Sequence, residues 1–566
     1  MAVYSQVSIK ASHPALTVSG KEVEGLAYIT YINEKSRYDD FADAGYKLYS
    51  VSLFFGTNHL NAISGQVTFS KGIFDSDTPD FSEFDANVYK LLQACPDAMI
   101  LPRVNVSPSR EWELSHPDEL CDTGVDSDPQ RKRVCFSSDA WADEVKRLLT
   151  VFTDHVESSD FSSHIIGYQV AGGNTEEWFP FDMKGSVGIR SREKFEEHCK
   201  EKGIAPNQEE YFRFLSQMTA SRLIEFASHI KSITHGRLIV GVFYGYTFET
   251  FWRESTHHDL ASILKSDSID FICSPISYAS YAKGRNLGAD HAYMLPLASL
   301  KLHGKLYFSE NDTRTHLSSP PNDLPHYQNP VWYGPDKETT LEILKMHFAR
   351  AFINRHALWW FDMWGGWYHN RDYMDFMKKA RELTLEAQGL PCASETELAV
   401  FIDETALAYV EDKNAAKKIC SYIRKALGAI GAPYDAYLTS DFEEVKERYK
   451  AFISLVPYSS AGSKIIKEYS KESRAPLLEI DSSNHDISAA DIREFCKSAK
   501  VHLYTNDECV VYVNQSYIFI HSAKDGEISL SLPENEKLFE VFECREYPHS
   551  FSARLGKSFL FKREKA

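Results

Sequence analysis

The sequence contains no apolar segment long enough to cross a membrane and no excess of basic residues. Its apolar runs fall short of the roughly 18 residues that a membrane helix needs, and its first residues do not combine a basic stretch with an apolar run. The net charge of −18 disfavours nucleic acids and anionic membranes as partners, because a phosphate-binding surface needs a basic excess. We therefore expect a cytoplasmic protein whose ligand is neutral or polyhydroxylated.

Metal and thiol motifs are also missing. The ten cysteines are scattered, without a Cys-x-x-Cys pair, so free thiols in a reducing compartment are expected. The chain has neither a His-Glu-x-x-His helix nor a Gly-x-Ser-x-Gly turn, which disfavours zinc hydrolases and serine hydrolases. The cluster His257-His258-Asp259 is typical of a loop that begins a helix. No metal ion and no cofactor are predicted.

Short apolar runs alternate with longer amphipathic segments from residue 25 to about residue 370. This alternation is typical of βα units and a parallel sheet, and eight such units predict a closed (β/α)₈ TIM barrel. The alternative, an open doubly wound sheet, usually has a glycine-rich phosphate loop after its first strand, whereas this chain has Tyr31-Ile-Asn-Glu-Lys there. The predicted strands are Gly25–Ile32, Tyr46–Phe55, Ala98–Val106, His164–Ala171, Arg237–Tyr244, Ile269–Ile276, Lys305–Ser309 and Ala357–Phe361.

Helical periodicity marks three long segments around these strands. Apolar residues recur every three or four positions in Asp139–Val156, Gln208–Ile233 and Glu338–Ile353, which predicts amphipathic helices. Ahead of the barrel, Ala15–Val23 predicts a small hairpin that turns at Ser19-Gly20.

Two smaller regions follow the predicted barrel. After Leu390-Pro391 the chain predicts a smaller α/β unit, and Gly428-Ala-Ile-Gly431 within it is typical of a helix end rather than a nucleotide loop. The tail is rich in short strands with turn signals and predicts a small antiparallel β-sandwich. We expect three domains: residues 1–390, 391–500 and 501–566. The strands and the helix predicted in the two regions are Leu398–Ile402, Asn414–Ile430 (helix), Ala451–Val456, Leu477–Ile480, Val510–Val513, Tyr517–His521, Ile528–Leu532, Leu538–Phe542 and Ser558–Phe561.

Two stretches run from an apolar strand into exposed glutamates. The first ends in Asn174-Thr-Glu176-Glu177-Trp178, and the second is Leu-Tyr-Phe-Ser-Glu310. The loops after the strands of a TIM barrel form its active-site face. Two carboxyl groups placed there are what acid/base cleavage of a glycosidic bond requires.

The choice between the two adjacent glutamates is open at this point. Neighbouring side chains of an extended chain point to opposite sides, so only one of Glu176 and Glu177 is expected to face the barrel axis. The pair Gly172-Gly173 favours a β-bulge, which would change the side to which each of the following side chains points. Glu177, directly before Trp178, is favoured, with Glu176 as the alternative.

Further polar and aromatic residues follow the predicted strands. A buried arginine such as Arg103 needs a carboxylate or a ligand, and Tyr278 could hydrogen-bond the carboxylate on strand seven. Strand eight carries four tryptophans within nine residues, which suits stacking against sugar rings. The predicted substrate-binding residues are Arg103, Asn105, Trp112, Asn174, Tyr278, Asp312, Trp360 and Trp364.

These motifs resemble those of clan A glycoside hydrolases. The resemblance rests on Leu-Pro-Arg103-Val-Asn105, on Tyr168-Gln169-Val before an Asn-plus-Glu turn, and on Ser-Glu310-Asn-Asp. The three-part layout is similar, over nearly the whole chain, to the trimeric β-galactosidases of glycoside hydrolase family 42 and to related gut-bacterial β-galactosidase and β-mannosidase families.

The resemblance implies a (β/α)₈ barrel, a flavodoxin-like trimerisation domain and a small C-terminal β domain. It also implies that Glu177 is the general acid/base and Glu310 the nucleophile. Arg103 and Asn174 would then lie in the sugar site, with Tyr278 near the nucleophile.

We therefore expect an exo-acting retaining β-glycosidase that cleaves terminal sugars from oligosaccharides by double displacement. A β-galactosidase is the first expectation and a β-mannosidase of the same clan is the alternative. From another class, the chain could be a non-catalytic carbohydrate-binding barrel. The expected partners are the carbohydrate substrate and other copies of the chain in a homotrimer, with no nucleic acid and no membrane.

Overall fold

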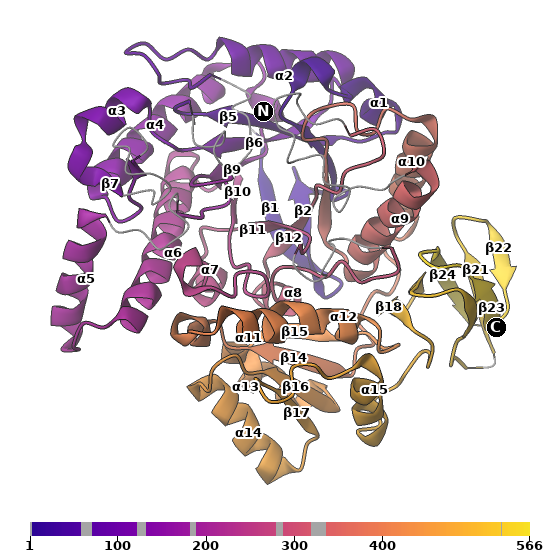
Figure 1. Cartoon of the computed structure of the whole chain (residues 1–566). Helices are drawn as coiled ribbons and strands as arrows, with labels where there is room; N and C mark the ends of the chain where they lie inside the picture. Colours follow the sequence, from indigo (N-terminus) through magenta and orange to yellow (C-terminus); the bar gives the residue numbers. More distant parts are fainter. Residues whose placement is uncertain are drawn as a thin grey trace.

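The computed structural model describes residues 3–57, 71–121, 132–180, 188–278, 287–318, 336–533 and 535–565. Three groups of secondary structure follow one another along the chain. Figure 1 shows the barrel in indigo to pink, a second sheet in orange on one side of it, and the C-terminal strands in yellow. No helix of the described ranges is long and apolar enough to cross a membrane.

Eight parallel strands close into a barrel, with the last strand paired to the first. All eight predicted strands are found, and the predicted TIM barrel is confirmed. Their residues are buried almost throughout, as expected for a parallel sheet covered on both faces. The strands are β4 (Leu26–Thr30), β5 (Leu48–Phe54), β6 (Met99–Asn105), β9 (Gly167–Ala171), β10 (Ile239–Phe243), β11 (Phe271–Pro275), β12 (Leu306–Asn311) and β13 (Ala357–Phe361).

One strand boundary differs from the prediction in a way that matters for the site. Strand β12 continues for two residues past Ser309, so Glu310 and Asn311 belong to the strand and pair with Trp359 and Trp360 of β13. Glu310 is therefore held by the barrel itself rather than by the loop that follows it.

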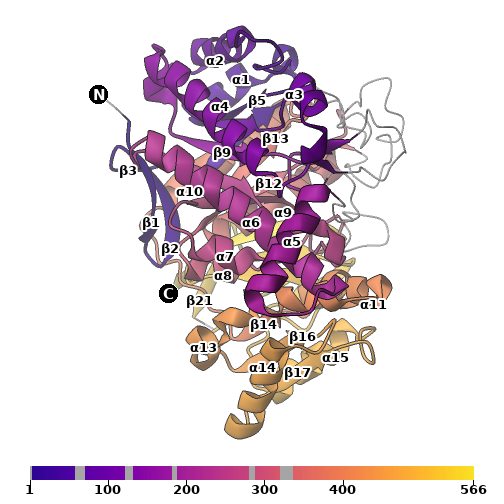
Figure 2. The same ribbon diagram turned by 90° about the vertical axis from the view of Figure 1, so that its left-hand side faces the viewer.

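Helices cover the outside of the barrel (Figure 2). The three predicted long helices are present as α4 (Asp139–Ser158), α6 (Gln208–Ile233) and α9 (Lys337–Asn354). Ser138 caps α4, because its hydroxyl accepts a hydrogen bond from the Trp141 amide at 3.0 Å. The other elements here are α1 (Tyr38–Asp43), α2 (Ser82–Ala94), α3 (Arg110–Ser115), β7 (Leu120–Cys121), β8 (Arg133–Val134), α5 (Ile189–Lys202), α7 (Leu260–Lys265), α8 (Leu297–Leu302) and α10 (Arg371–Glu386).

A small antiparallel sheet precedes the barrel. It contains β1 (Ser5–Lys10), β2 (His13–Val18) and β3 (Lys21–Glu22), and the predicted turn at Ser19-Gly20 joins the last two strands. Both turn residues have positive φ, 48° for Ser19 and 80° for Gly20. Strand β1, which was not predicted, contacts the barrel through its Ser5 amide, which donates to the Arg237 carbonyl at 2.8 Å.

The second group forms a four-stranded parallel sheet in the order β15-β14-β16-β17. If these strands are numbered by their order along the chain, their spatial order is 2-1-3-4. The first four strands of a flavodoxin-like sheet have the same order. The predicted helix from Asn414 to Ile430 is divided by a π-helical segment, and its second part ends at Gly428, which confirms a helix end there. The elements are β14 (Leu398–Ile402), α11 (Lys413–Lys417), α12 (Ile423–Gly428), β15 (Asp435–Leu438), α13 (Phe442–Val445), β16 (Ala451–Leu455), α14 (Ala461–Ser473), β17 (Leu477–Ile480) and α15 (Ala489–Ser498).

The third group is antiparallel. A five-stranded sheet, β18-β19-β24-β21-β22, packs on the pair β20-β23 over one shared apolar core, as predicted for a small sandwich. Strands β22 and β23 were not predicted. The strands are β18 (Cys509–Val513), β19 (Tyr517–Ser522), β20 (Gly526–Ser529), β21 (Glu536–Glu540), β22 (Arg545–Tyr547), β23 (Ser550–Ala553) and β24 (Ser558–Lys565).

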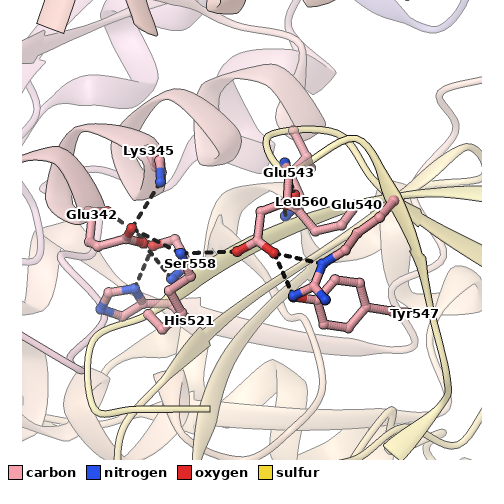
Figure 3. Close-up of polar contacts among 10 residues, drawn as sticks. Glu342, Lys345, His521, Glu540, Glu543, Tyr547, Ser558 and Leu560 are labelled. Carbon is pink, nitrogen blue, oxygen red and sulfur yellow. Dashed lines mark hydrogen bonds and ion pairs between the residues drawn. The ribbon is translucent and has the colours of Figure 1, made fainter. Parts of the chain in front are cut away.

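Polar contacts attach this C-terminal sheet to helix α9 of the barrel (Figure 3). The Glu342 carboxylate accepts hydrogen bonds from the Ser558 amide and from Lys345 Nζ, both at 2.8 Å. The Ser558 hydroxyl lies 3.0 Å from the Glu342 carbonyl and 2.8 Å from His521 Nδ1. Since Glu342 and His521 are both buried, these bonds form a fixed junction rather than a surface contact.

The α/β unit is joined to the barrel by a carboxylate. Glu404, which lies after β14, accepts hydrogen bonds from the amides of Leu260 at 2.6 Å and Ala261 at 2.9 Å. These amides belong to the first turn of α7 and have no partner within their own helix. A side chain of the second unit therefore caps a helix of the first.

None of the ten cysteines forms a disulfide bond, and eight of them are buried, as predicted. Burial raises the pKa of the Cys420 and Cys509 thiols to about 12. These residues are therefore protonated core residues rather than reactive nucleophiles.

Candidate active site

Carboxylates, one guanidinium and several tyrosines gather where the barrel strands end. We call this group the carboxylate cluster. Arg103 and Asn105 come from β6, Glu310 from β12, and the others from the segments that follow β4, β9, β10, β11 and β12. Its members are Tyr31, Arg103, Asn105, Glu176, Glu177, Tyr246, Tyr278, Glu310 and Asp312.

Arg103 pairs with Glu310 inside the barrel. Its Nη2 lies 2.5 Å from Glu310 Oε2, and its Nε donates to Gln169 Oε1 at 3.1 Å. The guanidinium is 1% exposed and also faces the rings of Phe243 and Phe361, at 4.8 and 5.3 Å from their centroids. The expectation that a buried Arg103 needs a carboxylate is therefore met by Glu310.

The turn after β9 has an unusual backbone. Thr175, Glu176 and Trp178 have φ values of 60°, 68° and 63°, in the left-handed region that these residue types rarely adopt. Trp178 is fully buried and its indole Nε1 donates to the Val170 carbonyl at 3.2 Å, so it anchors the turn to the strand. Left-handed conformations held in this way cost of order 1–3 kcal/mol each and are typical of functional sites.

This backbone brings both neighbouring glutamates into the cluster. Glu176 accepts hydrogen bonds from the Tyr31 hydroxyl and, at 3.4 Å, from Asn105 Nδ2. Glu177 accepts from the Tyr246 hydroxyl at 2.8 Å. The prediction that only one of the two faces the site is wrong, because strand alternation does not apply to left-handed residues.

The two glutamates differ in exposure and in hydrogen bonding. Glu176 is 1% exposed, whereas Glu177 is half-buried. Glu177 receives a second hydrogen bond from the Thr175 hydroxyl at 2.9 Å. A ligand that enters from solvent can therefore reach Glu177 more easily than Glu176.

Burial raises the pKa of three carboxyl groups in the cluster. It raises the pKa of Glu177 to about 8, helped by the charge of Glu310 and opposed by the Tyr246 hydrogen bond. It raises the pKa of Glu310 to about 7, opposed chiefly by the charge of Arg103. It also raises the pKa of Glu176, again opposed by Arg103. Arg103 therefore favours the ionised form of Glu310, whereas the charge of Glu310 favours the protonated form of Glu177.

Asp312 and Tyr278 lie next to this pair. The Tyr278 hydroxyl donates to Asp312 and not, as expected from the sequence, to the carboxylate of Glu310. Asp312 nevertheless acts on Glu310, since its negative charge raises the pKa of that group. Both residues thus belong to the cluster.

Of the two predicted tryptophans on strand eight, only one lies past the end of the strand. Trp364 follows β13, and the Arg314 guanidinium lies 4.7 Å from the centroid of its ring. Trp360 lies on the outer face of β13, where its Nε1 donates to the Tyr46 hydroxyl at 2.9 Å and its ring meets Phe376 of α10. Trp360 is fully buried there and is not part of the site.

Two other predicted site residues contact residues outside the cluster. Trp112 on α3 stacks on His116, with ring centroids 4.1 Å apart. Asn174 is half-buried in the turn after β9, and its backbone N–H donates to the Phe179 carbonyl at 2.9 Å. A sugar contact for either side chain stays a prediction.

Sequence reasoning missed the two tyrosines that hold the glutamates. Tyr31 directly follows β4, Tyr246 lies three residues past the end of β10, and both are buried. Burial raises the pKa of both hydroxyl groups well above the usual range, so they act as hydrogen-bond donors. Their place just past a barrel strand was the available signal.

The described part of the chain contains no group of three or more His, Cys, Asp or Glu residues that could hold a metal ion. The chemistry of the cluster is that of its own groups. A carboxylate next to a guanidinium can act as a nucleophile or base, and a carboxyl group with a raised pKa can donate a proton at neutral pH.

A buried ion pair connects the cluster to the α/β unit. Arg424 of α12 donates through Nη2 to Glu249 at 3.1 Å, and both side chains are buried. Glu249 also accepts from the Tyr278 amide at 2.9 Å, and Tyr278 in turn contacts Asp312. Arg424 thereby fixes the segment that carries Tyr278.

No family model matches the sequence, and no curated protein matches it. Solved structures do match it over nearly the whole chain. A β-galactosidase from Bacillus circulans sp. alkalophilus is 12% identical with a TM-score of 0.64, covering 96% of this chain and 99% of that one. A β-galactosidase from the psychrophilic Marinomonas ef1 is 10% identical with a TM-score of 0.61, covering 96% and 100%.

A GH42 exo-carrageenase from Bacteroides ovatus is 12% identical with a TM-score of 0.61, and the match covers 100% of this chain and 85% of that one. The chain thus has the three-part fold of glycoside hydrolases built on a TIM barrel. More particularly, the structures it resembles are β-galactosidases and a member of glycoside hydrolase family 42. The resemblance predicted from the sequence is confirmed at the level of the fold.

The ion pair between Arg424 and Glu249 can be tested by a double-mutant cycle. We expect Arg424→Met to destabilise the protein by about 3–5 kcal/mol, because it leaves a buried carboxylate without its cation. The double variant Arg424→Met/Glu249→Gln removes both charges and should recover part of that loss. The measurement is the midpoint of chemical or thermal unfolding.

Arg371→Met serves as the control, because the Arg371 side chain is 91% exposed and its pairing with Asp375 at 3.6 Å should contribute little. If the double variant were no more stable than Arg424→Met, the two charges would not be coupled.

Proposed function

We propose that the protein is an exo-acting retaining β-glycosidase in which Glu310 is the nucleophile and Glu177 the general acid/base. The observation that carries the proposal is the carboxylate pair itself. Arg103 holds Glu310 and favours its ionised form, whereas burial and the charge of Glu310 favour the protonated form of Glu177. A retaining mechanism needs one ionised and one protonated carboxyl group facing the same bond.

The proposed reaction is a double displacement. Glu310 attacks the anomeric carbon while Glu177 protonates the departing oxygen, and a glycosyl ester forms on Glu310. Once Glu310 is esterified its negative charge is gone, and because that charge contributes to the raised pKa of Glu177, this pKa then falls. The carboxylate of Glu177 then takes a proton from the water that cleaves the ester.

Arg103 and Tyr246 have supporting roles in this scheme. The charge of Arg103 lowers the pKa of Glu310 against the effect of burial, which keeps part of Glu310 ionised near pH 7. The Tyr246 hydroxyl orients Glu177 by its 2.8 Å hydrogen bond. Without Arg103 the pKa of Glu310 would rise, and less of Glu310 would be ionised at neutral pH.

The remaining members of the cluster are proposed to bind the sugar. Asp312, Tyr278 and Asn105 offer hydrogen-bonding groups next to Glu310 and Glu176. Asn174 and Trp364 are proposed to contact the same sugar at the rim, the latter by stacking of its indole. Glu176 is the candidate for accepting a hydrogen bond from a sugar hydroxyl.

A β-galactoside is the proposed substrate. Two of the solved structures that share the fold are β-galactosidases, which supports this choice. A β-mannoside is the alternative within the same clan. We further propose a cytoplasmic location. The ten cysteines form no disulfide bond, which supports this location, since disulfides are rare in a reducing compartment.

The first test is a set of glutamine variants assayed on nitrophenyl β-galactoside and β-mannoside and on a disaccharide. We expect Glu310→Gln to abolish turnover, because no glycosyl ester can form. Glu177→Gln should lower kcat/KM on the disaccharide by about 10²–10⁴-fold. It should affect the cleavage of nitrophenyl substrates less, because nitrophenolate leaves without a proton.

Azide distinguishes the acid/base from a merely structural glutamate. Azide can replace water without a general base, so it should restore turnover of Glu177→Gln and yield a β-glycosyl azide, detected by NMR. Glu176→Gln should not be rescued, and the exposed control Glu338→Gln should behave as wild type. If azide restored turnover of Glu176→Gln instead, the acid/base would be assigned to Glu176. If the wild-type protein released nitrophenol from none of the substrates, a non-catalytic barrel would be favoured.

The second test is the pH profile of kcat/KM. Activity needs Glu310 ionised and Glu177 protonated, so it should fall below about pH 7 and above about pH 8. Because the two carboxyl groups interact, the apparent pKa values of the acidic and basic limbs describe the pair and not single residues. Asp312→Asn removes a negative charge that raises the pKa of Glu310, so its acidic limb should move to lower pH. An unchanged acidic limb in Asp312→Asn would contradict this arrangement.

The third test concerns assembly. We propose a homotrimer, on the resemblance of the layout to trimeric β-galactosidases. Mass photometry should give three times the chain mass of 64.5 kDa. A monomer at assay concentration would remove this part of the proposal without affecting the assignment of the carboxylates.

A further inference from the structure

A cavity lined by described residues lies apart from the carboxylate cluster. It has a volume of about 380 Å³ and lies where the N-terminal hairpin, α8, α12, β15 and β18 meet. Helix α8 contacts β15 and helix α12 contacts β18, and Figure 1 shows α8, α12 and β15 at the lower side of the barrel. The volume falls within the roughly 300–1,000 Å³ range of small-molecule sites.

Basic side chains from separate parts of the chain line this cavity. Lys301 comes from α8, Arg355 follows α9, and Arg448 precedes β16. Among the described residues none of the three has a carboxylate within ion-pair distance. Lys301 Nζ lies 3.4 Å from Asn354 Oδ1, and Arg355 Nη2 donates to the Ala387 carbonyl at 2.8 Å.

One nitrogen in this group is buried without a partner. Arg355 Nε has no hydrogen-bond partner among the described residues. A buried donor without a hydrogen-bond partner destabilises the folded protein, and more so when the donor is charged. Burial also lowers the pKa of Lys301, and the charge of Asp435 offsets only part of that effect. An anion in the cavity would satisfy both groups.

The acidic residues of the cavity do not neutralise these cations. Asp290 faces Arg350 at 3.8 Å and accepts from the Tyr512 hydroxyl. Arg424, the other arginine of the cavity wall, is paired with Glu249. Asp435 accepts a hydrogen bond from the Tyr449 hydroxyl at 2.8 Å. It is the one remaining carboxylate among the described residues that line the cavity, against the three cations Lys301, Arg355 and Arg448. The cavity therefore carries an excess of about two positive charges.

The other groups of the wall are suited to a polar organic molecule. His13 is kept neutral, because burial and the charge of Arg355 lower its pKa to about 4, so it can offer a hydrogen bond without adding charge. The rings of Tyr293, Tyr437 and Tyr449 provide flat faces in the same wall. Their hydroxyls already pair with other protein groups, that of Tyr293 with His356 Nε2 at 2.7 Å and those of Tyr437 and Tyr449 with each other at 2.8 Å.

We propose that this cavity binds a phosphate ester of about monosaccharide size, with Lys301 and Arg355 contacting the phosphate. A phosphate monoester carries about −1.5 to −2 charges at pH 7, which matches the excess in the cavity. Lysine and arginine are the common phosphate-binding side chains. The inference does not depend on the glycosidase activity, because no member of the carboxylate cluster lines the cavity.

Binding is tested on the full-length protein by calorimetry and by the shift of the thermal midpoint. Glucose 6-phosphate is the probe, and inorganic phosphate, glucuronate and glucose are the comparison ligands. We expect glucose 6-phosphate to bind and to raise the midpoint with concentration. The three comparison ligands should each bind at least about tenfold more weakly, because each lacks either the dianion or the sugar ring.

Variants assign the site. Lys301→Gln and Arg355→Gln should each weaken binding of glucose 6-phosphate by about tenfold or more, whereas the exposed control Lys464→Gln should not change it. Asp435→Asn removes the competing carboxylate and should strengthen binding several-fold, a gain that misfolding cannot produce. Since all these variants keep the carboxylate cluster, binding in the active site would be unaffected by them.

Several outcomes would overturn the proposal. These are no binding by wild type at millimolar concentrations, equal affinity for glucose or glucuronate, unchanged affinity in both Lys301→Gln and Arg355→Gln, or weaker binding in Asp435→Asn. If inorganic phosphate bound as tightly as glucose 6-phosphate, the cavity would be a general anion site. That result would contradict the proposal that it binds a phosphate ester of about monosaccharide size.

Discussion

The ion pair between Arg103 and Glu310 at the end of the barrel interior is the interaction on which the site depends. Removing a guanidinium from water costs several kcal/mol, which is recovered only if a charge partner and further hydrogen bonds are in place. Glu310, Gln169 and two aromatic ring faces supply them from β12, β9, β10 and β13. One cation therefore holds the ends of several strands together and fixes the orientation of the carboxylate.

Much of the fold could be predicted because barrel strands are short apolar runs with clear ends. All eight strands were found, and Arg103 and Glu310 were recognisable as charged residues at the ends of such runs. The position of Arg103 on a buried strand also predicted that a carboxylate would lie next to it, since a buried arginine without a carboxylate is rarely stable. These inferences depend only on local pattern and on the cost of burying charge.

The rest of the site depends on backbone conformations and on packing that no local pattern reveals. Glu176 and Glu177 both enter the cluster because Thr175 and Glu176 are left-handed, and nothing in Asn-Thr-Glu-Glu-Trp predicts this. Tyr31 and Tyr246 come from strands far apart in the chain. Trp360 was misplaced because a run of aromatic residues does not show which of them faces outward.

The cap that Glu404 places on helix α7 has a consequence for how the chain can be divided. A fragment that ended before β14 would retain every barrel strand, yet it would lose this cap together with the cation of Arg424 that neutralises Glu249. Two amides would then lack their hydrogen-bond acceptor, and the carboxylate of Glu249 would lack its cation, beside the strands that carry the site. The barrel is thus not a self-sufficient module, and the C-terminal half of the chain contributes to its integrity as a folding unit.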